Sequence, residues 1–302
     1  MKVVIFGASG FVGRNLVPKL IENSFEVVGS GSREKPADLT CEYVQCDVRD
    51  KQKVEGIVRG ADFVVHLAAG NLRESMQDPL KDAETTILGS LNILEVCVKH
   101  KIKKIIFAST GAVYDVKNDE PVTEETPCKP HSPYAISKLA VENYLRFYHE
   151  KHGLNYVVFR LFNVYGPGQS ASGGSLIPVV IDKISKGEEI TIFGDGNATR
   201  DYVFVGDVCD CFVEALKRED IKNDFFNLAS GYSASVKKII SAAEKALDKK
   251  AKIKYVKPNK SEILRIKTDI TKLSKAFKKK PVEAVRWIEK HGDELVGTKR
   301  NS

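Results

Sequence analysis

Tyr134 and Lys138 lie four residues apart, near the start of a segment (residues 134–152) that the sequence predicts to be a long helix. Side chains four apart share one face of a helix, so the ammonium would lie one turn from the phenol. A free tyrosine has a pKa of about 10 and is a poor base near neutrality, whereas a nearby cation favours its phenolate. The pair can therefore take a proton from a substrate hydroxyl as hydride leaves the carbon. A surface pair on a helix is the alternative interpretation.

Three glycines follow the first predicted strand. Gly7, Gly10 and Gly13 form GASGFVG directly after residues 2–6, at the start of a helix predicted over residues 11–22. One glycine permits the tight turn, one lets a pyrophosphate approach the backbone, and one allows the helix to pack closely on the sheet. Free N–H groups at the N-terminus of the helix favour the phosphates. The motif therefore predicts a dinucleotide site, with a purely structural turn as the alternative.

The second predicted strand ends without the acidic residue that usually holds the adenosine ribose in such a site. Residues 30–32 read Ser-Gly-Ser, and Arg33 follows them. No carboxylate is present to repel a 2′-phosphate, and a guanidinium is available to bind one, so the sequence predicts NAD or NADP and favours NADP. A flexible loop with a solvated Arg33 is the alternative. Asp47, at the end of the third strand, can accept a hydrogen bond from the adenine amino group or cap its own loop.

Two hydroxyl residues, Ser109 and Thr110, end another predicted strand. They would lie at the carboxyl edge of the sheet, where ligands bind in open α/β sheets. A hydroxyl at this edge can share a hydrogen bond with Tyr134 and the reacting oxygen. Capping of the strand end is the alternative.

The elements that must position these groups alternate along the chain. The predicted strands are residues 2–6, 26–28, 43–46, 63–66, 104–109 and 156–161. The predicted helices are residues 11–22, 54–58, 80–100 and 134–152. Strands that alternate with helices predict an α/β fold with a doubly wound parallel sheet of the Rossmann type.

This alternation stops after Gly166. Residues 167–174 are rich in Gly, Ser and Pro, which is typical of a loop, and the chain after Ala234 reads as helical and lysine-rich. We expect a dinucleotide-binding domain over residues 1–166, with a return segment at residues 203–230. Residues 167–302 would form a smaller substrate-binding lobe.

The composition excludes several classes of protein. Of the 302 residues, 42% are hydrophobic and 29% are charged, as in an ordinary globular protein. No apolar run reaches the roughly 18 residues that a membrane helix needs, and the six cysteines show no zinc or disulfide-scaffold spacing. The net charge of +7 comes without a motif that reads nucleic acid. We therefore expect a cytoplasmic protein that binds no membrane, nucleic acid or metal.

Seven stretches of the sequence, in order, resemble the extended short-chain dehydrogenases/reductases, in their NAD-dependent nucleotide-sugar epimerase/dehydratase group. They are GASGFVG (7–13), CDV (46–48), HLAA (66–69), FASTGAVY (107–114), PVTEETPCKPHSPYAISK (121–138), RLFNVYGPGQ (160–169) and RDYVFVGDV (200–208). The resemblance implies that Thr110, Tyr134 and Lys138 are the catalytic group, with Ser109 as a less favoured stand-in for Thr110.

The same resemblance implies two sets of binding residues. The cofactor would contact Gly7, Gly10, Phe11, Val12, Gly13, Ser32, Arg33, Asp47, Val48, Leu67, Ala68, Ala69, Thr86, Ser109, Tyr134, Lys138, Phe162 and Val164. The nucleotide sugar would contact Thr110, Asn163, Ser175, Leu176, Phe193, Arg200 and Lys260. In this family two long helices pair across a dimer axis as a four-helix bundle, so a homodimer is expected.

Several of these positions have other interpretations. Thr86 stands where the family has an asparagine, and Lys260 replaces a late phosphate-binding arginine with a flexible cation. Asn163 and Arg200 resemble diphosphate contacts, with a strand-end amide and a surface salt bridge as the alternatives. Phe193 can pack on the nucleotide base or can be a core aromatic residue.

The residues after the catalytic hydroxyl narrow the chemistry. Sugar dehydratases and decarboxylases of this family carry an acid just after that hydroxyl, whereas Gly111 and Ala112 stand here and neither can transfer a proton. We therefore expect an NAD(P)-dependent 4-epimerase that acts on a UDP-hexose or UDP-N-acetylhexosamine through a 4-keto intermediate. The alternatives are an NADP-dependent reductase of a nucleotide-linked keto sugar and a non-catalytic NADP-binding scaffold.

Overall fold

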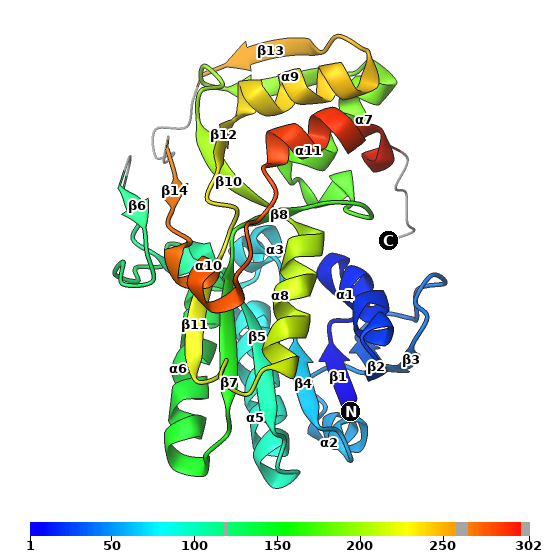
Figure 1. Ribbon diagram of the computed structural model, residues 1–302, viewed down its shortest axis with the longest axis vertical. Coiled ribbons are helices and arrows are strands. Elements are labelled where there is room, and N and C mark those ends of the chain that lie inside the picture. The colour runs from blue at the N-terminus through cyan, green and yellow to red at the C-terminus, as the bar shows by residue number, and fades with distance from the viewer. Residues whose placement is uncertain (118–119, 258–264, 297–302) are drawn as a thin grey trace. The chain divides into compact units, whose positions relative to one another are not determined.

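The computed structural model describes residues 1–117, 120–257 and 265–296 (Figure 1). The chain forms two compact units, and each unit is made of several separate segments. The first unit consists of residues 1–115, 127–161 and 209–226. The second unit is drawn from residues 116–126, 162–208 and 227–302.

The first unit is built on a seven-stranded sheet with the order β11-β7-β5-β4-β1-β2-β3. Its strands are β1 (Lys2–Phe6), β2 (Glu26–Gly31), β3 (Glu42–Gln45), β4 (Phe63–His66), β5 (Lys104–Thr110), β7 (Tyr156–Leu161) and β11 (Asp224–Leu228). The six strands from β7 to β3 run parallel. The strand order reverses between β1 and β4, which is the point where open α/β sheets bind ligands beyond the carboxyl ends of their strands. The predicted α/β fold with a doubly wound parallel sheet is confirmed.

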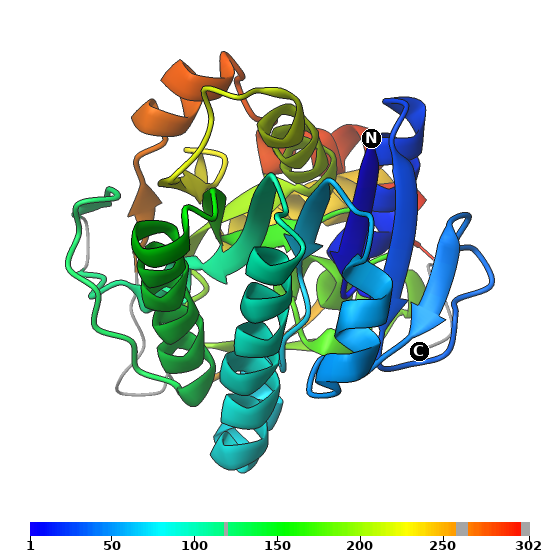
Figure 2. The ribbon, with the colours of Figure 1, turned by 90° about the horizontal axis from the view of Figure 1, so that it is seen from below.

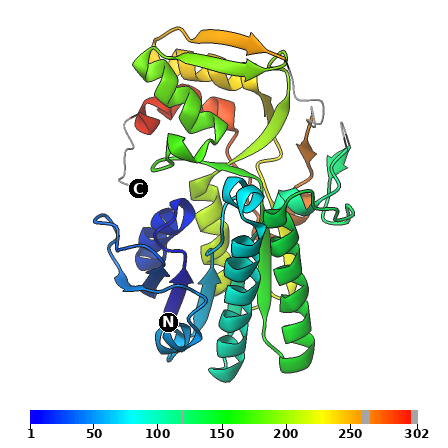
Figure 3. The ribbon, with the colours of Figure 1, turned by 180° about the vertical axis from the view of Figure 1, so that it is seen from behind.

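Helices cover both faces of this sheet. They are α1 (Phe11–Glu22) and α8 (Val205–Lys217) on one face, and α2 (Lys51–Val58), α5 (Gly89–Lys99) and α6 (Pro133–His152) on the other (Figure 2). An ion pair of 3.2 Å between Lys19 and Asp210 joins α1 to α8, and Figure 3 shows α5 and α6 side by side. Because both faces are covered, the central strands are largely apolar, and residues 3–6 of β1 are fully buried.

The structure differs from the single helix predicted over residues 80–100. The chain instead forms α3 (Leu72–Gln77), α4 (Pro79–Ala83), a π-helical turn η1 (Glu84–Leu88) and then α5. Pro79 opens α4 and the Asp78 side chain accepts a hydrogen bond from Lys81 N, so this helix starts before residue 80. A π turn changes the residue count of one helical turn, and apolar periodicity does not reveal it.

The second unit contains three small sheets and four helices within the described residues. Its strands are β8 (Asn163–Tyr165), β10 (Thr199–Phe204) and β12 (Ser233–Ser235) in one sheet, β9 (Glu189–Phe193) with β13 (Lys252–Val256), and β6 (Pro121–Val122) with β14 (Lys267–Thr268). The helices are α7 (Leu176–Lys186), α9 (Val236–Leu247), α10 (Thr271–Phe277) and α11 (Ala284–His291). Apolar faces of α7, α9 and α11 form a separate core with Ile190 and Ile192 of β9.

The boundaries between the units lie at different residues from those expected. The first unit ends at Leu161 rather than at residue 166, because β8 pairs with β10 of the second unit, with Asn163 opposite Tyr202. The return segment covers residues 209–226 rather than 203–230, since the chain passes between the units within α8 and within β11.

A buried lysine fastens the return segment. Lys104 of β5 donates from Nζ to the carbonyl oxygens of Ala215 and Arg218, each at 2.7 Å. The last carbonyls of a helix lack partners within the helix, and a cation at that end satisfies them. Lys104 thereby ties the end of α8 to the middle of the sheet.

The described residues include no helix that is long and apolar enough to cross a membrane. All six cysteines are free thiols, and Cys128 is the exposed one among them. Over residues 1–117, 120–257 and 265–296, no cluster of three or more His, Cys, Asp or Glu side chains could hold a metal ion.

Candidate active site

The glycine-rich turn connects β1 to α1. Gly7 has a φ of +89°, and a Cβ there would lie 2.7 Å from Ala68 N. A Cβ on Gly13 would lie 2.5 Å from Gly7 O, so only glycine lets α1 pack this closely on the turn. No side chain caps α1 at Gly10. The first N–H groups of the helix are therefore open to phosphate oxygens.

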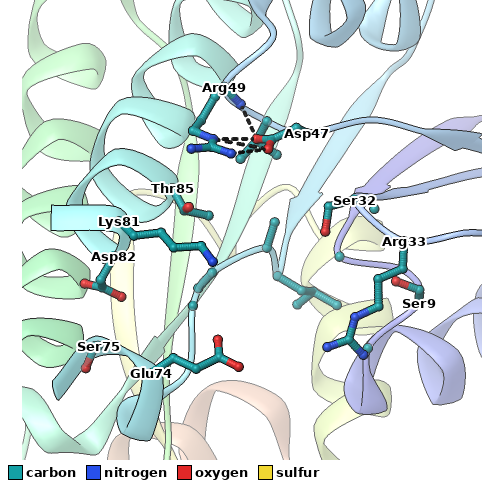
Figure 4. A pocket seen from close by; sticks show the side chains of 18 of the residues that line it. Ser9, Ser32, Arg33, Asp47, Arg49, Glu74, Ser75, Lys81, Asp82 and Thr85 are labelled. Atoms are coloured by element: carbon teal, nitrogen blue, oxygen red, sulfur yellow. Dashed lines mark hydrogen bonds and ion pairs between the residues drawn. The ribbon is translucent and has the colours of Figure 1, made fainter. Parts of the chain in front are cut away.

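A pocket of about 590 Å³ lies beside this turn (Figure 4). Its volume is in the range of small-molecule sites, roughly 300–1,000 Å³. The predicted cofactor residues that line it are Gly7, Gly10, Ser32, Arg33, Asp47, Val48, Leu67, Ala68 and Ala69. Of the remaining ones in the first unit, Phe11, Val12 and Gly13 form the first turn of α1, and Thr86 is buried within η1.

Sequence reasoning missed further residues of this pocket. They are Ser9, Gly31, Cys46, Arg49, Gly70, Glu74, Ser75, Gln77, Asp78, Lys81, Asp82 and Thr85. Most of them lie between β4 and η1, in the part of the chain that was predicted as loop and uniform helix. The cap residues Asn71 and Asp78, which accept from Glu74 N and Lys81 N, were the available signal for two short helices here.

The loop after β2 forms one wall of the pocket. Two side chains of β3 hold its backbone: the Tyr43 hydroxyl donates to Arg33 O at 2.7 Å, and Gln45 Nε2 donates to Ser32 O at 3.0 Å. With the carbonyls held, the Ser32 and Arg33 side chains line the pocket (Figure 4). A Cβ on Gly31 would lie 2.7 Å from Ser9 Oγ, so this position has little room for the acid that it lacks.

Asp47 lies on another part of the wall and is bound by Arg49. Arg49 Nη2 lies 2.7 Å from Asp47 Oδ2, and Arg49 Nε donates to both carboxylate oxygens at 3.1 Å (Figure 4). These bonds hold the pKa of Asp47 below its ordinary value. Arg49 also meets Glu84 Oε2 of η1 at 3.1 Å. Asp47 is therefore a charged acceptor, and both of its oxygens already bind Arg49. The sequence analysis did not identify this arginine.

Thr110, Tyr134 and Lys138 lie at the end of β5 and in the first turns of α6. Thr110 Oγ1 accepts from Ala112 N at 3.2 Å, which leaves the hydroxyl proton available to a ligand. Lys138 is 2% exposed, and its Nζ donates to Ala108 O at 2.7 Å. The same Nζ lies 5.8 Å from the centroid of the Tyr134 ring. The structure thus brings the lysine near both the phenol and the strand end that carries Thr110.

The acidities of this group differ from the expectation that Lys138 lowers the pKa of Tyr134. Burial raises the pKa of Tyr134 to about 12, and the charge of Asp82 acts in the same direction. Burial also lowers the pKa of Lys138 to about 7, against the opposing effects of Asp82 and Glu142. Tyr134 is a neutral phenol near pH 7, beside a lysine that is close to losing its charge.

Asp82 is a buried carboxylate of α4 that the sequence analysis did not identify. It is 4% exposed, and its Oδ1 lies 3.5 Å from Thr86 Oγ1 of η1. Its charge acts on both Tyr134 and Lys138. The π turn places Thr86 one turn from Asp82, so the hydroxyl that replaces the family's asparagine contacts a carboxylate of its own helix.

His66, at the end of β4, is a packed residue that is buried in the first unit. Its Nε2 lies 2.7 Å from Ser90 Oγ, and burial lowers its pKa to about 3. The imidazole is therefore neutral near pH 7 and is no base in this site.

Ser109 has a partner that sequence reasoning missed. Its hydroxyl donates to Glu142 Oε1 at 2.5 Å, and Glu142 also binds the Arg160 guanidinium, with Nη2 to Oε2 at 2.6 Å. Ser109, Glu142 and Arg160 are all at most 5% exposed. The serine hydroxyl thus connects β5 to α6 at a point beside Thr110.

The predicted residues of the second unit lie on three of its sheet strands and at the start of one helix. Asn163 of β8 donates from Nδ2 to Asp201 O at 2.8 Å, and Arg200 of β10 donates from Nη1 to Thr199 O at 2.9 Å. Ser175 precedes α7, which starts at Leu176. Phe193 ends β9 and is 61% exposed, so it is not the core residue considered as an alternative.

Phe162, Val164 and Lys260 are the remaining predicted residues. Phe162 follows β7 and donates from its backbone N–H to Leu228 O at 3.1 Å, and Val164 lies in β8. Lys260 lies outside the described residues.

Comparisons with known proteins were made for the whole chain. A putative UDP-glucose 4-epimerase of Methanocaldococcus jannaschii is 38% identical, over 89% of this chain and 90% of the relative. A dTDP-4-dehydro-6-deoxyglucose reductase of Escherichia coli is 31% identical over 85% of each chain. The structure of UDP-glucose 4-epimerase from Thermus thermophilus in complex with NAD matches with a TM-score of 0.90 at 31% identity, over 98% of this chain and 99% of that one.

The family comparison covers the seven strands of the first unit, the glycine turn and the three predicted catalytic residues. The model of the NAD dependent epimerase/dehydratase family matches residues 3–229. This range runs from β1 through Thr110, Tyr134 and Lys138 to the end of β11. By this match and by the similarity over most of its length, the chain belongs to the NAD-dependent epimerase/dehydratase family.

Proposed function

We propose that this protein is a nucleotide-sugar 4-epimerase that acts on a UDP-hexose or a UDP-N-acetylhexosamine. The observation that carries the proposal is the group of Thr110, Tyr134 and the buried Lys138, with Gly111 and Ala112 in the turn η2 (Gly111–Val113) directly after Thr110. That turn offers no acid for an elimination or a decarboxylation. The names of the similar proteins support the nucleotide-sugar class.

A nicotinamide dinucleotide fits the glycine turn. Gly7 and Gly13 let the turn pack closely against the backbone around it, and the uncapped start of α1 offers N–H groups to a pyrophosphate. Asp47 and Val48 would contact the adenosine end. Bound there, the nicotinamide would supply a hydride acceptor for sugar C4 and a hydride donor for the keto sugar.

The chain's own residues handle the proton. Tyr134 takes the proton of the C4 hydroxyl as the carbon is oxidised, and it returns that proton when the keto sugar is reduced on its other face. The Thr110 hydroxyl can donate to the reacting oxygen because its own oxygen already accepts from Ala112 N. The pKa of Tyr134 must fall from about 12 for this role, so Lys138 has to carry its proton in the active state.

The test gives the purified protein UDP-galactose, UDP-glucose and their N-acetyl forms, without added reductant, and resolves the sugars. Interconversion of C4 epimers without a net change in NAD(P)H is the expected result. Stoichiometric consumption of NADPH with a nucleotide-linked keto sugar would support the reductase. Absence of both activities would leave the non-catalytic scaffold.

The control for this assay is Tyr134→Phe. Loss of the phenol removes the acid–base group, and such groups contribute typically about 10²- to 10⁴-fold to the rate. Dinucleotide affinity, measured by calorimetry, should stay within about twofold of wild type. Retained turnover in this variant would contradict the assignment of Tyr134.

We further propose that NADP is preferred over NAD. Support comes from the loop after β2, where Ser9, Ser32 and Arg33 line the pocket and Gly31 has no carboxylate. A guanidinium and two hydroxyls suit a 2′-phosphate, whereas an acid would repel it. The similar Thermus thermophilus protein is a complex with NAD, so Arg33 is the feature from which we infer a different preference.

We also propose separate tasks for the two units. The first unit would bind the dinucleotide, and Asn163, Ser175, Leu176, Phe193 and Arg200 of the second unit would bind the nucleotide diphosphate sugar. Arg200 suits phosphate oxygens through its planar guanidinium, and the exposed Phe193 ring offers a surface on which a base can stack.

A homodimer is proposed from the exposed side chains of η1 and α6. Leu88, Ile136, Tyr144 and Phe147 are exposed large apolar residues. Many other apolar side chains of α5 and α6 lie inside the first unit: Ile93, Leu94, Val96, Cys97, Val141, Leu145 and Tyr148 are buried. The proposal therefore uses the other faces of the same helices.

A cytoplasmic location is proposed from the free thiols of all six cysteines.

A further inference from the structure

Helix α6 carries three functional groups on one face, and two of them are buried. Tyr134, Lys138 and Glu142 follow each other at intervals of four residues, so they lie one above the other along the helix. Lys138 is 2% exposed and Glu142 is 5% exposed. The proposed epimerase chemistry uses the first two groups and leaves the carboxylate of Glu142 without a role.

The Glu142 carboxylate is saturated with charged and polar donors from two strands. Its Oε1 accepts from Ser109 Oγ of β5 at 2.5 Å and from Arg160 Nε of β7 at 3.1 Å. Its Oε2 accepts from Arg160 Nη2 at 2.6 Å and Nε at 3.2 Å. These four bonds compensate the buried carboxylate, whereas Arg160 Nη1 is buried without a hydrogen-bond partner.

The contacts of Glu142 and Lys138 fall on consecutive residues of β5. Lys138 Nζ binds Ala108 O at 2.7 Å, Glu142 binds the Ser109 hydroxyl, and Thr110 is the next residue. Two successive turns of α6 therefore fasten two successive residues of β5, directly before the catalytic hydroxyl.

Arg160 extends the attachment to the far side of Thr110. Its guanidinium carbon lies 4.6 Å from the ring centroid of Tyr114 and 4.5 Å from that of Phe225. Tyr114 directly follows the turn η2 after Thr110. The segment from residue 108 to residue 114 is thus held on both sides of Thr110, by Glu142 through Ser109 and by Arg160 through Tyr114.

We propose that Glu142 is a positioning residue, which fixes the Thr110 hydroxyl against Tyr134 through Ser109 and Arg160 and keeps a negative charge one turn from Lys138. The proposal rests on the proposed function for its kinetic readout only. In this proposal Glu142 touches neither substrate nor cofactor. It sets the position of Thr110 relative to Tyr134 and supplies a negative charge near Lys138.

The charge effect has a defined direction. Burial holds the pKa of Lys138 down to about 7, and Asp82 of α4 and Glu142 of α6 oppose that fall. His66 of β4 is neutral at this pH, since burial lowers its pKa to about 3. Arg160 shares the Glu142 carboxylate, and Cys128 lies close enough for both charges to act on its thiol. Removal of the Glu142 charge should therefore move the titration of Lys138 to lower pH.

The first experiment compares Glu142→Gln with wild type. We expect kcat near pH 7 to fall about tenfold, KM to stay within about twofold, and the Lys138 titration midpoint to move down by at least half a pH unit. The midpoint is read by NMR with nitrogen-labelled lysine, and Lys138→Met assigns the signal. The matched control is Glu150→Gln, which removes an exposed carboxylate from the same helix and should change none of these values.

A second variant separates positioning from folding, because Glu142→Gln leaves Arg160 buried beside a neutral partner. In Glu142→Met/Arg160→Met the ion pair is replaced by apolar side chains of similar length, a change that proteins often tolerate. We expect thermal stability close to wild type, with the low kcat and the shifted midpoint retained. Wild-type kcat in this folded variant would overturn the proposal, as would an unmoved Lys138 midpoint in both variants.

The proposed function can fail separately. If wild-type protein interconverts no nucleotide sugar, the epimerase proposal fails, while the Lys138 midpoint still decides the role of Glu142. If wild type is active and the midpoint does not move, the epimerase stands and Glu142 is only a structural residue.

Discussion

At the scale of single residues, the proposed preference for NADP depends on the side chains of Ser32 and Arg33, directly after β2. Tyr43 and Gln45 hold the backbone carbonyls of this loop, so a substitution at Ser32 or Arg33 changes the side chain without releasing the loop. The charge at these two positions can therefore be changed without moving the backbone of the loop. Cofactor preference is therefore best tested here.

The variants for this test are Ser32→Asp and Arg33→Leu. A carboxylate at residue 32 would repel a 2′-phosphate and accept from a ribose hydroxyl, and loss of Arg33 removes a charge-assisted bond worth about 1.5–3 kcal/mol. Calorimetric Kd values for NADP+ should rise at least tenfold in both variants, with the Kd for NAD+ unchanged or lower. Arg59→Leu, which removes an exposed arginine after α2, is the control. Equal affinities of wild type for NAD+ and NADP+ would contradict the preference.

Lys138 gives the second prediction at this scale, on stability against pH. Its pKa is about 7 in the folded chain and 10.5 as a free side chain. Between these values the unfolded chain holds one more proton, so stability rises with pH by up to about 1.4 kcal/mol per pH unit from this group. Lys138→Met lacks this contribution.

Chemical denaturation of both proteins at several pH values measures the effect. The difference in unfolding free energy, wild type minus Lys138→Met, should grow in favour of wild type from pH 7 to pH 9. A difference that stays flat over this range would mean that the lysine keeps its ordinary pKa in the folded protein.

At the scale of elements, the packing of α1 on the glycine turn depends on an absent side chain. A Cβ on Gly13 would meet only backbone atoms, within 2.5–2.7 Å of Gly7 O, Ala8 Cα and Ala8 O, and backbone cannot rotate away. Gly56 in α2 has nothing within 4 Å of the same atom. A substitution at Gly13 therefore tests the packing, and the same substitution at Gly56 is its control.

Gly13→Ala should shift α1 away from β1. We expect a loss of stability of about 1–3 kcal/mol from overpacking and a rise of the dinucleotide Kd of at least tenfold, since the first turn of α1 would leave its place. Gly56→Ala should be neutral or stabilising by up to about 1 kcal/mol, because alanine is the better helix former. Thermal unfolding and calorimetry measure both, and equal effects of the two substitutions would refute the packing argument.

Elements also show what the sequence could and could not predict. The alternation of apolar strands and helices, and the glycine turn with its helix, follow from local patterns, and the predicted parallel sheet is confirmed. The π turn at residues 84–88 has no such local pattern. Nor has the attachment of Glu142 to Ser109 and Arg160, because it joins α6 to two strands that are distant in sequence. The low pKa of Lys138 was missed because burial, which no spacing reveals, outweighs the neighbouring charges.

At the scale of the whole molecule, the proposed homodimer depends on exposed apolar side chains. Ile136 is 53% exposed and Phe147 is 47% exposed, both on α6. Apolar side chains exposed in a row on one element often mark an interface. The proposal is that a second copy of this chain covers them.

The corresponding variant is Ile136→Glu/Phe147→Glu. Two carboxylates would remain buried and unpaired in a dimer, so sedimentation velocity should show a shift from dimer to monomer at micromolar concentration. Ile21→Glu, on the other face of the sheet and 43% exposed, should leave the sedimentation coefficient unchanged. A monomeric wild-type protein would contradict the proposal.

The return of residues 209–226 to the first unit makes the order of synthesis matter. β7 ends at residue 161 and its neighbour β11 begins at residue 224, which is 63 positions later. At about 5–20 residues per second, a ribosome needs roughly 3 to 13 s to bridge that gap. During this interval the nascent sheet ends at an unpaired β7, and an open edge strand can pair with other chains. Lys104 of β5 also lacks its acceptors, the carbonyl oxygens of Ala215 and Arg218, during this interval. The seventh strand can therefore join the sheet only after residues 162–208 of the second unit have been synthesised.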